Sequence, residues 1–140
     1  MLSILGAFIS TIGLSICFCV QKKHLFSCGL IGALGWTIYL IADSLKCGTT
    51  LATFLAALII TQVSYSLARR HKTPITVYLI AGIIPLVPGL GLYRMMFAML
   101  NEDYASAINY ATLTFEVAAV IAGAIVIISL FPLLWKPPNR

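Results

Sequence analysis

The stretch Ile83–Met96 most constrains what this chain of 140 residues can fold into. It lies inside an apolar segment long enough to cross a bilayer, yet it contains Pro85, Pro88, Gly89 and Gly91. Proline removes a backbone donor and clashes with the carbonyl group four residues before it. A membrane helix tolerates such a break only where protein or a water-filled cavity satisfies the freed groups. The sequence therefore predicts an interrupted membrane helix.

The composition is typical of an integral membrane protein. Hydrophobic residues make up 61% of the chain and charged residues only 9%, and long apolar runs of this kind indicate membrane spans. We therefore expect one all-α transmembrane domain over residues 1–140, surrounded by the lipid bilayer. The net charge of +5 does not indicate a nucleic-acid partner, because the basic residues stand in short clusters between apolar runs.

The apolar runs predict a polytopic protein with about five transmembrane helices, the fourth of them broken at Pro85–Gly91. The predicted spans are residues 2–20, 25–42, 48–68, 74–100 and 104–131. The fourth is longer than the ~20 residues that one straight span needs, which fits two half-helices with an unwound middle. Small residues recur on spans one and two and predict close helix contacts: Gly6, Ser10, Gly13 and Cys17, then Gly29, Gly32 and Gly35.

The basic clusters predict the orientation of the chain in the membrane. They follow spans one, three and five and contain seven of the nine basic residues: Lys22, Lys23, Arg69, Arg70, Lys72, Lys136 and Arg140. Basic loops lie on the cytoplasmic side, so the N-terminus is expected outside and the C-terminus in the cytoplasm. This arrangement leaves Lys46 outside and Arg94 within the membrane.

Two charges are expected inside the membrane, where an unpaired charge is costly. Arg94 follows the broken stretch, and Glu116 lies in span five on a helical seam with Asn109 and Thr112. Arg94 stays protonated and needs an anion, which is either Glu116 or a substrate carboxylate. Glu116 in turn pairs with Arg94, pairs with another subunit, or carries a proton. The half-helix that begins near Gly89 also favours an anion at its positive end.

No motif of a soluble enzyme is present, and the chain is not expected to be an enzyme. A broken membrane helix followed by a charge is instead typical of a substrate site in a secondary transporter. The cysteines lack a His or a carboxylate at ligand spacing, so we expect neither a metal nor a cofactor. His24 and His71 stand in basic loops and are expected to be solvated or lipid-facing.

The pattern Ile-Pro-x-x-Pro-Gly-x-x-x-Tyr over Ile84–Tyr93 resembles the threonine/serine exporter family. The similarity extends from about Leu2 to Leu134, and Pro85, Pro88, Gly89 and Tyr93 carry over as the family motif. Arg94 and Glu116 are not carried over from the family and rest on the physical argument alone. In a split branch of that family the two membrane halves are separate polypeptides, and this chain looks like the short one with the carboxy-terminal half.

The resemblance implies an efflux carrier of the bacterial inner membrane for small hydrophilic metabolites, either threonine and serine or small dicarboxylates. It also implies a longer partner subunit, and the small-residue faces allow assembly with a second copy. The predicted substrate-binding residues lie on both sides of the break and on span five: Pro85, Pro88, Gly89, Gly91, Tyr93, Arg94, Asn109, Thr112 and Glu116. The alternatives are a non-transporting scaffold or channel-forming subunit, and a small antiporter that uses Glu116. The position of Glu116 in the last span disfavours the antiporter.

Overall fold

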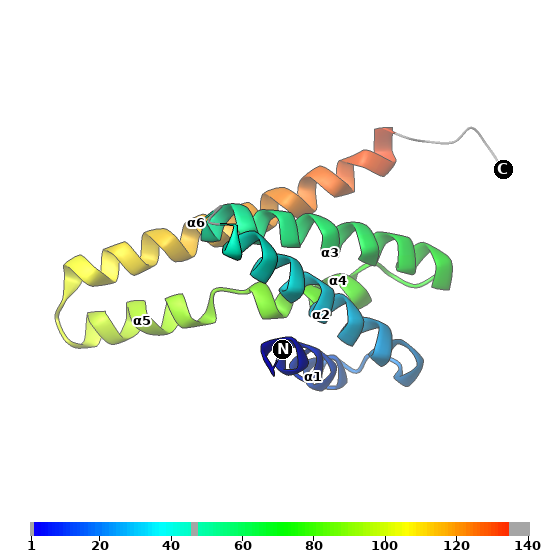
Figure 1. Ribbon diagram of the computed structural model, residues 1–140, viewed down its shortest axis with the longest axis horizontal. Coiled ribbons are helices and arrows are strands. Elements are labelled where there is room, and N and C mark those ends of the chain that lie inside the picture. The colour runs from blue at the N-terminus through cyan, green and yellow to red at the C-terminus, as the bar shows by residue number, and fades with distance from the viewer. Residues whose placement is uncertain (1, 46–47, 135–140) are drawn as a thin grey trace.

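The computed structural model describes residues 2–45 and 48–134, and every regular element within these ranges is a helix (Figure 1). Lys46, Lys136 and Arg140, used above to predict orientation, lie outside the described residues. The elements in chain order are α1 (Leu2–Cys17), α2 (Lys22–Ser44), α3 (Thr49–His71), α4 (Thr76–Ile83), the short 3₁₀ helix η1 (Ile84–Leu86), α5 (Gly89–Leu100) and α6 (Tyr104–Leu134).

The helix lengths agree with a polytopic membrane protein. Among the described residues, α2, α3 and α6 are each long and apolar enough to cross a bilayer. A fourth crossing forms if Thr76–Leu86 and Gly89–Leu100 count as one span, which is bent by 51°. The predicted break in the fourth span is thereby confirmed. The remaining apolar helix, α1, has 16 residues, and with it the all-helical fold matches the prediction of about five spans.

α1 ends three residues before the predicted end of span one. Cys19 adopts a left-handed conformation with φ of 54°, and the N–H of Val20 donates to the carbonyl of Ser15 at 3.0 Å. This 6→1 hydrogen bond closes the helix in a Schellman motif. The predicted span ends at Val20 because it is based on apolar composition, and hydropathy does not reveal a left-handed turn. α2 then begins at Lys22, so its basic residues are helical rather than part of a loop.

The core lies where α2, α3 and α4 meet, and its largest buried side chains are Tyr78, Ile31 and Ile60. Two glycines let these helices approach closely. A methyl group built on Gly82 of α4 would lie 2.6 Å from Cγ2 of Ile31 and 2.9 Å from Cγ2 of Ile60, and one on Gly35 of α2 would also overlap Ile60. These contacts fix α4 against the other two helices.

The predicted close contact of span two with its neighbours is therefore present. Gly29 and Gly32 of α2 face α1, where a methyl group on Gly32 would overlap Thr11. The small face predicted on span one is a different case. A methyl group on Gly6 or Gly13 would meet nothing within 4 Å, so at these positions α1 packs closely against none of the described residues.

α5 and the first part of α6 form a hairpin that extends away from the body formed by α1–α4 (Figure 1). Within the described ranges α5 packs extensively against α6 alone, whereas the later part of α6 packs against α3. Ile121 and Ala124 of α6 belong to the core cluster. α6 therefore joins the hairpin to the body.

We predict that Gly82→Ala lowers the melting temperature of the detergent-solubilised protein. The added methyl group overpacks the contact with Ile31 and Ile60, which costs about 1–3 kcal/mol in a well-packed core. Gly123→Ala makes the same change where nothing lies within 4 Å, and it should leave the melting temperature equal or higher because alanine is the better helix former. Equal melting temperatures for both variants would contradict the close approach of α4.

A second prediction concerns Asp103, which caps α6. The N–H of Ser106 donates to its Oδ1 at 3.1 Å, and hydrogen bonding from the Ser106 hydroxyl, followed by that from its N–H, lowers the pKa of the Asp103 carboxyl group. A carboxyl group whose pKa is lower in the folded state stabilises the fold above its unfolded-state pKa and loses that effect as the pH falls through the folded-state value.

Asp103→Ala should therefore lower the melting temperature at about pH 7, and the difference from the wild type should shrink at about pH 3, below the usual aspartate pKa. Asp103→Asn retains an acceptor for the Ser106 N–H, so it should remain close to the wild type at neutral pH. A deficit of Asp103→Ala that stays constant with pH would argue against the capping role.

Candidate functional site

The break lies between η1 and α5, at Val87 and Pro88. Val87 has an extended backbone, with φ of −61° and ψ of 130°, and its N–H donates to the carbonyl of Ile84 at 3.2 Å. Pro85 and Pro88 contribute no N–H, so a regular helical ladder cannot run through this segment. α5 starts afresh at Gly89, as predicted, with Leu92 donating to the carbonyl of Pro88 at 3.2 Å.

The glycines of the motif have different surroundings. Gly89 is exposed, and a methyl group built on it would meet nothing within 4 Å. Gly91 packs against α6, where a methyl group would overlap Oγ1 of Thr114. Gly91 thus serves the close approach of α5 to α6. It also sets the register of the hairpin, in which Thr114 lies opposite Gly91.

Tyr93 and Arg94 are both exposed on α5. The Tyr93 ring stacks on Phe97 with centroids 6.1 Å apart. Arg94 lines a cavity of about 280 Å³ between α5, α6 and the turn that joins them, together with Asn101 and Asp103 among others. Arg94 lies near the middle of α5, and its side chain shares this cavity with residues of the polar turn.

The structure does not pair Arg94 with Glu116. Glu116 accepts a hydrogen bond from Oγ1 of Thr50 on α3, with 2.9 Å between the oxygens. Arg94 makes no hydrogen bond or ion pair with any described residue, and the carboxylate of Asp103, which lines the same cavity, accepts a hydrogen bond from the N–H of Ser106. The guanidinium is thus left without an anion within the described part of the chain.

The polar seam on α6 is partly satisfied by its own helix. Thr112 donates to the carbonyl of Ile108 at 2.9 Å. Asn109 is exposed, and its side chain makes no hydrogen bond with any described residue. Glu116 lies two residues beyond Thr114, at the level of the first residues of α5. The predicted site residues therefore gather on the hairpin and the break, with Glu116 held toward α3.

Sequence reasoning missed the partner of Glu116. Thr50 belongs to a stripe of hydroxyl groups on α3 with Thr53, Thr61 and Ser64, but no feature of the sequence links it to a residue 66 positions later. Most other hydroxyl groups of that stripe bond backward within α3: Thr53 donates to the carbonyl of Thr49, and Thr61 donates to that of Ala57. Such local bonds are the usual alternative for threonine in a membrane helix.

The expectation for His24 is wrong. Its side chain is 3% exposed, and Nδ1 lies 2.6 Å from the hydroxyl of Tyr78 on α4. α2 begins two residues before His24, so its side chain turns into the body rather than into solvent. His71 is exposed, as expected. Among the described residues no group of three His, Cys, Asp or Glu side chains is arranged to hold a metal ion.

Comparison with protein families identifies the chain. The family model described as "Threonine/Serine exporter, ThrE" matches residues 3–131, a range that contains the break, the α5–α6 hairpin and Glu116. No solved structure matches the chain. The resemblance based on Ile84–Tyr93 is confirmed for the family, which is one of transporters rather than enzymes. The chain therefore belongs to the threonine/serine exporter family and is an integral membrane protein.

Proposed function

We propose that the chain is one subunit of an efflux carrier for small hydrophilic metabolites that carry a carboxylate, with the α5–α6 hairpin as its contribution to the pathway. Threonine and serine, or small dicarboxylates, are substrates of this class. A longer membrane subunit with the complementary half, or a second copy of the chain, completes the pathway. The observation that supports this most directly is the unpaired Arg94 on the helix that follows the break.

The argument from Arg94 is electrostatic. A guanidinium group remains charged at every physiological pH, and holding it unpaired in an apolar environment is costly. Glu116, the acidic candidate on span five, is bonded to Thr50 instead. An arginine fork recognises a carboxylate with two parallel hydrogen bonds, so a substrate carboxylate satisfies Arg94 in a way that lipid tails do not.

The argument for a partner rests on the hairpin. Large apolar side chains such as Leu90, Phe97 and Phe115 are more than half exposed there, and lipid would suffice to cover them. Arg94 and Asn109 are also exposed on the same hairpin, and lipid tails offer them no hydrogen bond. A protein partner or a water-filled pathway can cover the apolar side chains and also hydrogen-bond Arg94 and Asn109. This favours a transporter subunit over an isolated scaffold.

The proposed location is the bacterial inner membrane, with the N-terminus outside. The α1–α2 turn and the C-terminal end of α3 lie at one end of the body, where the rings of His24 and His71 are 5.2 Å apart. Lys22, Lys23, Arg69, Arg70 and Lys72 all belong to these two segments. Basic residues gathered at one end favour the cytoplasmic side for that end.

For Arg94 we predict that Arg94→Gln lowers the efflux of radiolabelled serine or threonine by about tenfold or more, because a charged bidentate contact is lost. Efflux is measured from preloaded cells that express the chain together with its partner. Arg70→Gln removes the same charge from an exposed residue on α3 and should leave efflux near the wild-type rate. Wild-type efflux by Arg94→Gln, at equal expression, would show that this guanidinium serves only the lipid headgroups.

For the hairpin we predict that a partner shields it. In a variant without native cysteines, Asn109→Cys should react several-fold more slowly with a maleimide when the longer subunit is co-expressed, since packing excludes the reagent. Ser10→Cys, on the open face of α1, is the control for reagent access. Unchanged labelling at both positions, together with full efflux by the chain alone, would contradict the two-subunit pathway and favour a self-sufficient channel or carrier.

A further inference from the structure

The basic end of the body contains a buried histidine that the proposed pathway does not use. His24 of α2 and Tyr78 of α4 are joined through Nδ1 and the phenol oxygen at 2.6 Å, and Tyr78 is fully buried. The His71 ring of α3 stands edge-on to His24, with centroids 5.2 Å apart. Three helices thus fix the orientation of one imidazole.

The second ring nitrogen of His24 has no partner. Nε2 is buried and makes no hydrogen bond with any described residue. When the Tyr78 hydroxyl donates to Nδ1, Nε2 carries the proton and is a free donor. Buried polar groups are normally hydrogen-bonded, and an exception calls for an explanation. A donor held in place by Tyr78 and left open is suited to a ligand that accepts a hydrogen bond.

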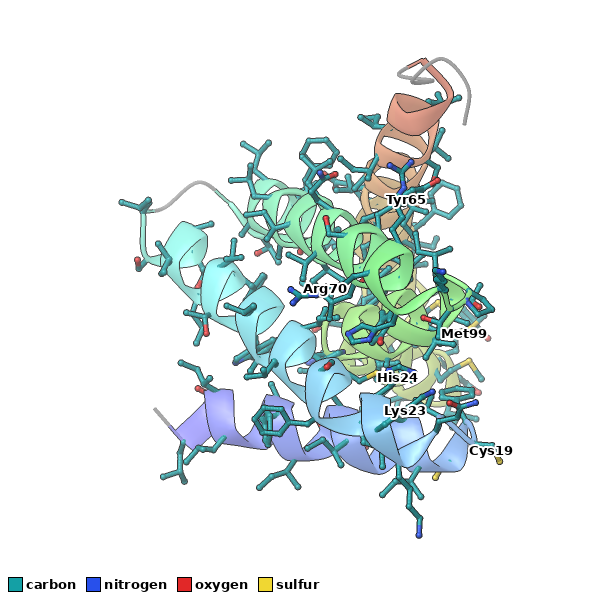
Figure 2. All side chains as sticks on the ribbon, turned by 90° about the vertical axis from the view of Figure 1, so that its right-hand side faces the viewer. Cys19, Lys23, His24, Tyr65, Arg70 and Met99 are labelled. Carbon is teal, nitrogen blue, oxygen red and sulfur yellow. The ribbon has the colours of Figure 1, made fainter. Side chains whose placement is uncertain are left out.

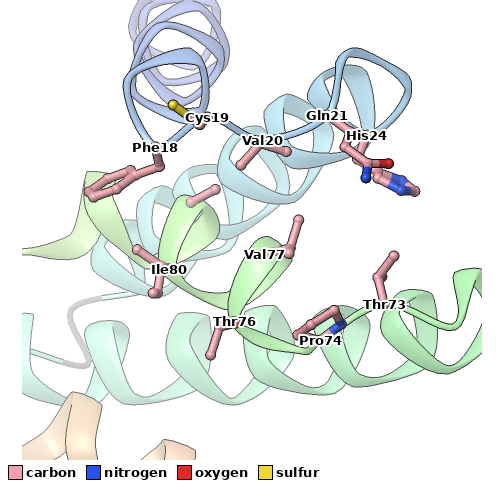
Figure 3. A pocket seen from close by; sticks show the side chains of 11 residues that line it. Phe18, Cys19, Val20, Gln21, His24, Thr73, Pro74, Thr76, Val77 and Ile80 are labelled. Carbon is pink, nitrogen blue, oxygen red and sulfur yellow. The ribbon is translucent and has the colours of Figure 1, made fainter.

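His24 lines a cavity of about 350 Å³ between the α1–α2 turn and the start of α4 (Figure 3). One wall is apolar and includes Phe18, Val77 and Ile80, while Gln21 and His24 lie together at one end. A cavity with one long apolar wall and a polar end is matched by an amphiphile, that is, by an apolar chain attached to a polar head.

The charges around the cavity select the sign of that head. Figure 2 looks onto this end of the body, which carries Lys23, His24 and Arg70. Lys22 stands beside Lys23 in the first turn of α2, and Arg69 beside Arg70 in the last turn of α3. No carboxylate belongs to either segment, because the four acidic residues of the chain lie elsewhere: Asp43, Glu102, Asp103 and Glu116.

We propose that this cavity binds an anionic phospholipid, with the phosphodiester oxygen accepting the His24 Nε2 hydrogen bond and an acyl chain lying along Phe18, Val77 and Ile80. The lysines of the first turn of α2 add electrostatic attraction to the headgroup. Basic pockets between membrane helices are suited to anionic headgroups. The site is built by the α1–α2 turn, the start of α2 and α4, so it is separate from the hairpin, and it does not depend on the proposed transport function.

The test is native mass spectrometry of the full-length protein extracted from bilayers that contain equal amounts of phosphatidylglycerol and phosphatidylcholine. We expect the wild type to retain phosphatidylglycerol over phosphatidylcholine. Lys22→Gln and Lys23→Gln should each lower that preference, by about fivefold per charge near a membrane surface. Addition of inorganic phosphate or of free serine to the extracted protein should not displace the lipid, because neither supplies the apolar chain.

A pair of substitutions at His24 separates ligand binding from structural support. The amide of His24→Asn ends near the position of Nδ1, so it can meet Tyr78 but places nothing at Nε2. The amide of His24→Gln reaches the position of Nε2 and keeps a donor facing the cavity. Phosphatidylglycerol retention should therefore fall in His24→Asn and persist in His24→Gln, whereas a purely structural role predicts the opposite order.

A second pair tests the apolar wall. Ile80→Trp fills the cavity and should abolish retention of phosphatidylglycerol, while Ile41→Trp, on the exposed surface at the other end of α2, should not. The proposal is overturned if both lipids are retained equally, if Ile80→Trp binds phosphatidylglycerol as the wild type does, or if phosphate or serine alone displaces the lipid. Displacement by phosphate or by serine would assign the cavity to a small polar solute instead.

Discussion

The absence of two backbone donors at Pro85 and Pro88 decides how this chain is divided. The helix that starts at Thr76 cannot continue through these positions with its hydrogen bonds intact. It tightens into η1, opens at Val87 and restarts at Gly89 after a bend of 51°. The first half of the span is fixed in the core by the close contacts of Gly82, and the second half leaves the body. The break thus separates the packed body from a hairpin whose two helices, among the described residues, pack mainly against each other.

That separation explains why Glu116 has a hydrogen-bond partner in the body, whereas Arg94 has none among the described residues. Glu116 lies where α6 returns toward the body, close enough for Thr50 of α3 to donate a hydrogen bond to it. Arg94 lies farther out on the hairpin, where α6 is the main neighbour of α5 among the described residues and no described carboxylate forms an ion pair with it. The two charges do not neutralise each other because the hairpin register holds them at different levels.

The sequence predicted those features that depend on local chemistry. The break followed from proline, the helical spans from apolar runs, and the close contacts of α2 from its glycines, since each of these signals is carried by neighbouring residues. The partners of Glu116 and His24 could not be predicted, because Thr50 is 66 positions away from Glu116 and Tyr78 is 54 positions away from His24. The error at His24 has a specific cause. A histidine beside two lysines resembles a loop residue until the start of α2 at Lys22 is known.

The basic end of the body and the hairpin also differ in the kind of polar group that each leaves without a partner among the described residues. At the basic end, three helices surround His24 and the polar group that remains open is a neutral donor beside an apolar wall. On the hairpin, a single helix pair carries an exposed cation near a polar turn. A neutral donor within a rigid, apolar cavity suits a ligand that stays bound and stabilises the body. An exposed cation on a protruding element suits a ligand that binds and leaves, because the Arg94 side chain remains exposed in the cavity that it lines. The fold therefore separates a region suited to permanent occupancy from one suited to turnover.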